Sequence, residues 1–218
     1  AIGYVAANLN AELPGQFEIE LFKYPDDLSS ALSRQTPRLL GFSNYSWNIN
    51  LSYEYVKQVK RQCPETVIVM GGPNYGLSQD EIADFWNRYP LIDFYIVFEG
   101  ERAMVELVRA LQAVNYDVKS LKKENKPLAN CHYKSGGRIV QGDSLPRIKD
   151  LSELSSPYLS GLMDKFFDGV LIPMISTTRG CPFKCTYCSE GIDYYSKVSK
   201  RHDISDELLY IAERTGTM

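Results

Sequence analysis

Hydrophobic positions along residues 1–113 follow two alternating spacings, one typical of helices and one typical of strands. Spacings of three and four predict helices at residues 2–9, 25–36, 51–63, 79–86 and 101–111. Short apolar or alternating segments predict strands at residues 17–22, 39–43, 67–70 and 94–97. Regular alternation of helix and strand is typical of an α/β fold. We therefore expect a Rossmann-like or flavodoxin-like parallel sheet with helices on its faces.

The opening of the chain predicts that this sheet lacks a strand. A helical pattern comes before any strand pattern, and the first residue is Ala1 rather than Met. At the other end, residues 205–218 predict a single helix with no structure after it. We therefore expect a fragment of a longer protein, with the first strand of the sheet lying before Ala1.

The second half of the chain predicts a boundary and two smaller segments. Residues 115–126 are polar and rich in lysine, which favours a solvated connection and a first domain at residues 1–126. Residues 127–168 read as a β-hairpin around Gly136 and Gly137, followed by a linker. Residues 169–218 form the third segment, which begins with an apolar, β-branched strand pattern at 170–176.

Composition and charge narrow the classes of partner. The chain has 218 residues, of which 44% are hydrophobic and 23% are charged, as expected for a folded protein with a core. Its net charge of −3 offers no basic surface for nucleic acid. The apolar runs are far shorter than the ~20 residues that a membrane-spanning helix needs. We expect a cytoplasmic protein with no nucleic-acid or membrane partner.

The most informative residues are three of the five cysteines. Cys181, Cys185 and Cys188 have the spacing Cys-x3-Cys-x2-Cys. Three thiolates on one loop can hold three irons of a 4Fe–4S cluster and leave the fourth iron open to another ligand. The alternative is a zinc site that uses the same cysteines and His202, although zinc sites normally pair two close ligand couples.

The cysteine segment resembles the start of a radical S-adenosylmethionine (radical SAM) enzyme, because a strand pattern runs into Arg179-Gly180-Cys181-Pro182 and Tyr187 precedes the third cysteine. The resemblance implies a 4Fe–4S cluster on the three cysteines, with S-adenosylmethionine on the open iron. It also implies an electron donor such as flavodoxin or ferredoxin. Residues 169–218 would be the first strand-helix unit of a partial TIM barrel, and Tyr187 would lie beside the adenine or pack as an ordinary loop aromatic.

The front block resembles the cobalamin-binding domain that precedes the radical domain in many such enzymes. The similarity lies in Ser43 and Asn44 after one strand, Gly71 and Gly72 after the next, and a Glu-Gly-Glu run at residues 99–101. The resemblance implies that these strand ends border the slot for cobalamin. One feature departs from the family, because Phe98 stands where glycine is common. The Asp-x-His-x-x-Gly motif of cobalamin mutases would follow the expected first strand before Ala1, so these residues neither show nor exclude it.

The two resemblances together imply a cobalamin-dependent radical SAM enzyme that methylates or rearranges an unactivated carbon of a small molecule. Two alternatives stay open: a radical enzyme whose front domain only docks a partner, and a zinc-stabilised binding domain. We assign no catalytic residue. Because the later barrel strands that hold S-adenosylmethionine are absent, we expect this fragment to be inactive by itself, and its open strand at residues 170–176 to favour dimers.

Overall fold

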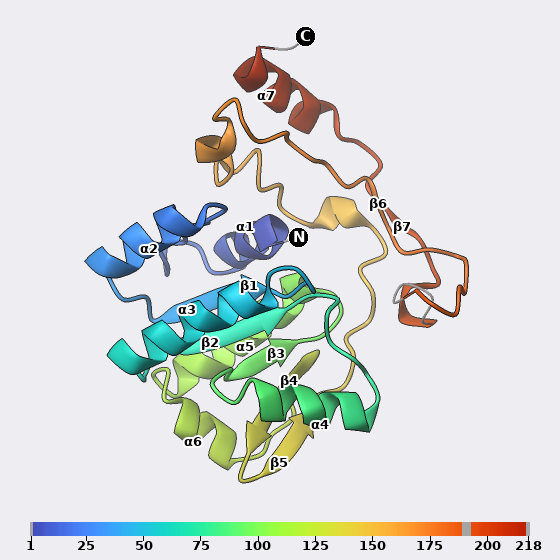
Figure 1. Cartoon of the computed structure of the whole chain (residues 1–218). Coiled ribbons are helices and arrows are strands. Elements are labelled where there is room, and N and C mark those ends of the chain that lie inside the picture. The colour runs from blue at the N-terminus through green and yellow to red at the C-terminus, as the bar shows by residue number, and fades with distance from the viewer. Residues whose placement is uncertain (1, 189–192, 217–218) are drawn as a thin grey trace. The chain divides into compact units, whose positions relative to one another are not determined.

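The protein is described by a computed structural model, which covers residues 2–188 and 193–216 (Figure 1). The chain forms two compact units. One unit is Phe22–Leu145, and the other joins the beginning of the chain, up to Leu21, to the part that follows Pro146. The predicted boundary at residue 126 therefore differs from the division in the structure.

The unit Phe22–Leu145 contains a sheet of five strands in the order β1-β2-β3-β4-β5. Strands β1 (Leu39–Ser43), β2 (Val67–Gly71) and β3 (Phe94–Ile96) are parallel. Strands β4 (Cys131–Ser135) and β5 (Arg138–Gln141) form a hairpin, and β4 pairs antiparallel with β3. The predicted α/β fold with a mostly parallel sheet is confirmed.

The helices of this unit are α2 (Pro25–Arg34), α3 (Ile49–Gln62), α4 (Gln79–Arg88), α5 (Gly100–Ala113) and α6 (Val118–Lys123). In Figure 1, α3 lies in front of the strands and α5 lies behind them. Helices on both faces explain why β2 is apolar from Val67 to Met70 and buried along that whole run. A capping box between Ser78 and Glu81 sets the start of α4.

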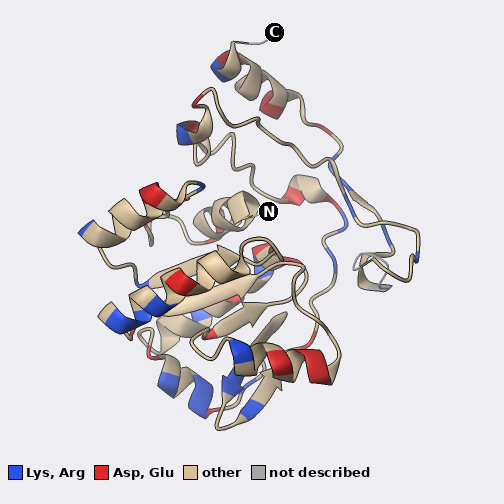
Figure 2. Cartoon of the chain, in the orientation of Figure 1, with Lys and Arg blue, Asp and Glu red and all other residues tan. Residues whose placement is uncertain are grey.

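The lysine-rich segment differs from its prediction as a solvated connection. It contains α6, whose basic residues are visible in Figure 2, and Lys122 on this helix lies 3.6 Å from Asp93 and over the ring of Phe94. Burial lowers the pKa of Lys122, while the neighbouring Asp93 carboxylate opposes that change. The predicted hairpin is confirmed, but it extends the main sheet and does not belong to a separate linker segment.

The second unit contains α1 (Ile2–Glu12), short 3-10 turns η1 (Leu151–Glu153), η2 (Asp164–Phe166) and η4 (Asp193–Tyr195), and α7 (Ser205–Thr215). Its two strands, β6 (Thr178–Arg179) and β7 (Ser199–Lys200), pair antiparallel. A small core forms from Tyr4, Ile148, Leu151 and Leu154. A buried ion pair joins Arg201 to Glu207 at 3.2 Å.

Two strand predictions are wrong. Residues 17–22 and 170–176 both have the required pattern, but neither pairs with another strand among the residues that the structure describes. Alternating apolar residues indicate one-sided burial, whereas a strand also needs a neighbour that completes its hydrogen bonds. For the same reason the expected barrel is not visible in residues 169–188 and 193–216, where β6 and β7 are the strands formed.

Candidate cofactor sites

Four residues predicted to border cobalamin meet at the carboxyl ends of β1 and β2. Ser43 is the register partner of Gly71, and the backbone N–H of Asn44 donates to the Gly71 carbonyl oxygen at 2.7 Å. Gly72 follows directly and is exposed. Carboxyl ends of neighbouring parallel strands are where ligands of open α/β sheets bind. The arrangement predicted from the sequence is therefore present.

The side chain of Asn44 joins the two loops that follow these strands. Its Nδ2 donates to the Asn74 carbonyl oxygen at 2.7 Å and to the Tyr95 hydroxyl at 3.1 Å. Its Oδ1 accepts from Asn74 Nδ2 at 3.1 Å, and the residue is only 1% exposed. The Asn44 side chain thus holds the loops after β1 and β2 together. A direct contact of this side chain with a ligand stays a prediction.

Gly72 is required by close backbone contact. Its φ of +136° lies in the region that side chains rarely adopt, and a Cβ there would lie 2.5 Å from the Asn44 carbonyl oxygen. The neighbouring Gly71 is less constrained, since its Cβ would lie 3.2 Å from the Ile96 carbonyl oxygen. A side chain at Gly72 would consequently push the two loops apart, in addition to any space that it took from a ligand.

A buried aromatic network below the two loops was missed by the sequence reasoning. Tyr95 donates its hydroxyl to the Gly72 carbonyl oxygen at 2.8 Å, and its ring stacks on Tyr75 with centroids 4.0 Å apart. Tyr75 in turn bonds His132 Nδ1 at 3.0 Å and accepts from Trp86 Nε1 at 3.1 Å. The high count of 15 tyrosines was the signal, but the sequence did not show which of them share a face.

This network is uncharged near neutral pH. Burial raises the pKa of Tyr75 to about 12 and lowers the pKa of His132 to about 4. A neutral imidazole and a neutral phenol can share one hydrogen bond without a buried charge. The network therefore supports the loops as a rigid base and carries no proton donor suited to neutral pH.

The loop after β1 also carries a stacked aromatic pair, the exposed Trp47 and the half-buried Tyr45. Trp47 is 78% exposed and stacks on Tyr45, with ring centroids 4.6 Å apart. Asn48 holds the base of the loop, because its Nδ2 donates to the Ser43 carbonyl oxygen at 2.9 Å and its Oδ1 accepts from the Tyr45 N–H at 2.8 Å. The pair offers a flat apolar surface next to the predicted site.

The Glu-Gly-Glu run at residues 99–101 lies at the start of α5. Glu99 and Glu101 are both buried. Glu99 directly precedes α5, but its side chain makes no hydrogen bond to the first backbone N–H groups of the helix. Glu99 therefore does not cap α5 through its side chain. Phe98 has a φ of +62°, a conformation that favours glycine, which agrees with its place at a position often occupied by glycine.

The cysteine segment is far less organised than the sheet edge. Cys181 is partly exposed, Cys185 and Cys188 are exposed, and all three are free thiols. Tyr187 is 90% exposed, and His202 is exposed as well. Within residues 2–188 and 193–216, no three His, Cys, Asp or Glu side chains are close enough together to hold a metal ion. Three thiols on one loop are donors that suit an iron–sulfur cluster, but the structure does not gather them, and their role as ligands stays a prediction.

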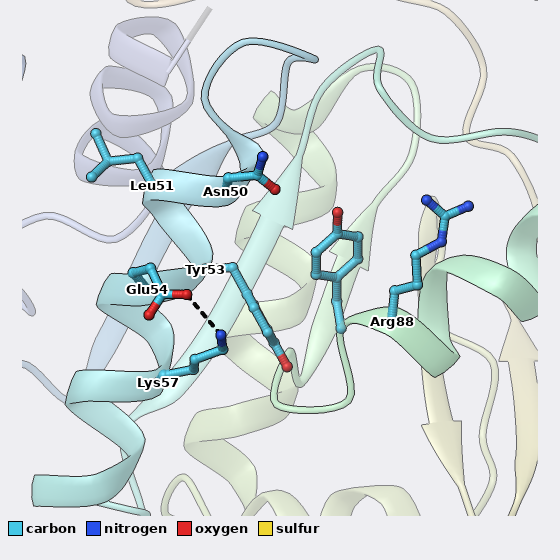
Figure 3. Close-up of a pocket in the computed structure, with 7 residues that line it drawn as sticks. Asn50, Leu51, Tyr53, Glu54, Lys57 and Arg88 are labelled. Carbon is cyan, nitrogen blue, oxygen red and sulfur yellow. Dashed lines mark hydrogen bonds and ion pairs between the residues drawn. The ribbon is translucent and has the colours of Figure 1, made fainter.

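A shallow hollow of about 430 Å³ lies elsewhere, over α3 and the end of α4 (Figure 3). Tyr53 and Tyr89 meet edge to face in it, and Lys57 pairs with Glu54 at 2.7 Å. None of the predicted site residues lines this hollow.

Comparison with known proteins identifies the family of the front block. The family described as B12 binding domain matches residues 3–108, which include all four strand-end residues. The chain carries a B12-binding domain. The resemblance to radical SAM proteins with a cobalamin-binding domain is thereby confirmed. In the described residues no helix is long and apolar enough to cross a membrane.

The similar curated proteins are enzymes. The chain is 28% identical over 189 residues to the cobalamin-dependent radical SAM methyltransferase TokK of Streptomyces tokunonensis, covering 81% of this chain and 26% of that protein. It is 30% identical over 161 residues to a 2-(S-pantetheinyl)-carbapenam-3-carboxylate methyltransferase of Streptantibioticus cattleyicolor, covering 71% and 22%.

A third relative carries a different activity in its name. The anaerobic magnesium-protoporphyrin IX monomethyl ester cyclase of Cereibacter sphaeroides is 24% identical over 168 residues, covering 76% of this chain and 26% of that protein. The chain therefore spans about a quarter of the length of these relatives. Both methyl transfer and ring formation occur among the named activities.

Proposed function

We propose that this chain is the cofactor-binding front of a cobalamin-dependent radical SAM enzyme that methylates an unactivated carbon of a small molecule. The observation that carries the proposal is the B12-binding match over a sheet whose strand ends bring Ser43, Gly71 and Gly72 together. Two of the three similar enzymes described above are named methyltransferases. Methyl transfer is therefore favoured over ring formation.

The residues at the sheet edge suit a large ring with a long polar tail. Exposed Gly72 and Pro73 leave backbone accessible beside β2, and glycine permits a ligand to approach closely there. The exposed Trp47, stacked on the half-buried Tyr45, supplies apolar surface for a flat ring face. In this proposal the Ser43 hydroxyl and the backbone after β2 orient the tail of cobalamin.

The second cofactor site would lie on the loop that carries the three clustered cysteines, called the cysteine loop below. Cys181, Cys185 and Cys188 would hold a 4Fe–4S cluster through their thiolates, and Tyr187 would lie beside S-adenosylmethionine. When bound, the cluster and S-adenosylmethionine supply a 5′-deoxyadenosyl radical, after one electron from a donor such as flavodoxin or ferredoxin. The loop itself would provide three thiolate ligands, fewer than the four irons of such a cluster.

Anaerobic reconstitution with iron and sulfide tests the cluster. We expect the wild-type chain to retain about four irons and a broad visible absorption, both lost when Cys181, Cys185 and Cys188 are replaced by Ala together. Cys63→Ser is the matched control, since Cys63 lies outside the loop and bonds Thr36. One tightly bound zinc and no iron would contradict the proposal and favour the zinc-stabilised binding domain.

A second candidate is a radical enzyme whose front domain only docks a partner. The hollow over α3 and α4, with its exposed Lys57 and Arg88, is the feature that favours it. Loss of cobalamin binding at the sheet edge, with cluster binding retained, would support this candidate.

A further inference from the structure

The side chain of Arg147 donates hydrogen bonds to residues on both sides of the cysteine loop. Nη1 donates to the carbonyl oxygens of Lys197 at 2.8 Å and Tyr194 at 3.3 Å. Nη2 donates to the Arg179 carbonyl oxygen at 3.2 Å and to Ser199 Oγ at 3.2 Å. The guanidinium also lies 5.1 Å from the ring centroid of Tyr195. One side chain therefore binds two separate stretches of backbone.

These two stretches are the two ends of the cysteine loop. Arg179 lies two residues before Cys181, whereas Tyr194, Lys197 and Ser199 all follow Cys188. The same ends are joined by the β6 and β7 pair and by the Cys181 N–H, which donates to the Tyr195 carbonyl oxygen at 2.9 Å. Arg147 thus closes the base of the loop that carries all three thiols.

Gly180 shows how tightly this base is packed. Its φ is +99°, and a Cβ there would lie 2.7 Å from the carbonyl oxygens of Lys197 and Tyr195 and 2.8 Å from Arg147 Nη1. The Arg147 guanidinium and the returning backbone thus occupy the space that a side chain would need. The position of the first cysteine is set by these contacts, while Cys185 and Cys188 extend into solvent.

We propose that Arg147 is a positioning residue that holds the two ends of the cysteine loop together for cluster binding. This inference rests on the proposed function, in which the three cysteines ligate the cluster. A closed loop loses less conformational entropy when its thiols converge on one ligand, so fixing its base favours binding. The planar guanidinium suits this role because its fixed fork reaches several carbonyls at once, whereas a lysine ammonium cannot.

Arg201 provides a matched control within the same unit. Its Nη2 also donates to two backbone carbonyl oxygens, those of Leu151 at 2.9 Å and Leu154 at 3.0 Å, and its Nη1 pairs with Glu207. Both arginines therefore bind backbone in the second unit. The side chain of Arg201 contacts neither end of the cysteine loop in these hydrogen bonds, so the same substitution separates general stability from loop closure.

The experiment compares Arg147→Lys and Arg201→Lys with the wild-type chain, using two measurements. Hydrogen exchange of the Cys181 amide in iron-free protein reports closure of the loop base, and iron retained after anaerobic reconstitution reports cluster binding. We expect Arg147→Lys to lower the protection of that amide about tenfold and to reduce retained iron severalfold. Arg201→Lys should leave both values within about twofold of wild type.

Equal effects of the two substitutions on both measurements would overturn the proposal, because they would assign Arg147 a general structural role. Ser199→Ala removes one of the four contacts of Arg147 and also the hydrogen bond from Ser199 Oγ to the Ile148 carbonyl oxygen, and it should lower Cys181 protection in the same direction but less. If Arg147→Lys does not fold, Ser199→Ala serves as the test. An unchanged protection of the Cys181 amide in Ser199→Ala would then contradict the proposal. Wild-type protein that holds no iron would refute the proposed function, while the difference in Cys181 protection still decides the role of Arg147.

Discussion

The two predicted cofactor sites differ in how much of their shape the protein makes by itself. At the sheet edge, Asn44, Asn74, Tyr95 and Gly72 are joined by hydrogen bonds of 2.7 to 3.1 Å beneath two loops. In the cysteine loop, the base is fixed by Arg147, but Cys185 and Cys188 are exposed and no three ligands converge in the described residues. The first site is shaped by the fold, whereas the second must be completed by its ligand.

This difference follows from the position of each site in its fold. Strand ends are fixed by the register of a buried sheet, so residues placed there need no ligand to meet. A short loop of thiols has few hydrogen bonds of its own, and metal binding supplies the free energy that orders such a loop. Substitutions at the first site should therefore lower both stability and ligand binding, whereas substitutions of the thiols at the second site should lower ligand binding alone.

The largest expected effect is that of Gly72→Leu, which tests whether the sheet edge is shaped by backbone contact. Because its Cβ would lie 2.5 Å from the Asn44 carbonyl oxygen at a φ of +136°, we expect the free energy of unfolding to fall. The loss should be about 3 kcal/mol or more in urea denaturation. Gly41→Ala is the control, since nothing lies within 4 Å of its Cβ, and it should change stability by less than about 1 kcal/mol.

The next effect concerns pH and the buried network under the loops. Burial lowers the pKa of His132 to about 4, below the usual value of 6.5. Between these two values the unfolded chain binds a proton that the folded protein does not. Stability should therefore be full above pH 6.5 and fall as the pH drops towards 4, by at most about 3 kcal/mol.

Chemical denaturation between pH 7 and 4 measures this loss, with His132→Asn as the comparison. The variant should show a flatter pH profile than the wild type, because it removes the titrating group. Parallel profiles for the wild type and His132→Asn would contradict the buried, neutral histidine.

A smaller effect is expected from Tyr95→Phe, which tests whether the buried aromatic network supports the two loops. The change leaves the Gly72 carbonyl oxygen without the hydroxyl that donates to it at 2.8 Å, at a cost of about 1–3 kcal/mol. Tyr133→Phe is matched, because Tyr133 is also buried and donates to the Lys126 carbonyl oxygen at 2.7 Å. Of the two variants, only Tyr95→Phe should also weaken cobalamin binding. Equal cobalamin affinities of the two variants would contradict a role of the buried network in shaping the loops.

The smallest effect concerns the unpaired segment at residues 170–176. Val170, Ile172 and Met174 are 75%, 86% and 82% exposed, which favours association through this segment. We expect concentration-dependent dimers in sedimentation analysis, reduced by Ile172→Lys. A strictly monomeric wild-type chain would contradict this prediction.

Sequence patterns predicted helices α1 to α5 and α7, the three parallel strands and the neighbouring strand ends, because burial and turn residues leave a local signature, but they missed α6 in the lysine-rich segment. They failed at residues 17–22 and 170–176, where the pattern is present but no described strand pairs with it. The roles of Tyr95, His132 and Arg147 could not be predicted either. Each depends on contacts between residues far apart in the chain, such as Arg147 with Ser199, which periodicity does not encode.

The central claim is that the sheet edge binds cobalamin independently of the cysteine loop. Titration of hydroxocobalamin, followed by its visible spectrum, tests this claim most directly in the wild type, Gly72→Leu and the triple Cys181, Cys185 and Cys188 to Ala variant. We predict saturable binding at micromolar cobalamin in the wild type and the triple variant, and strongly weakened binding in Gly72→Leu. No spectral change with the wild type, or equal binding by Gly72→Leu, would contradict the account.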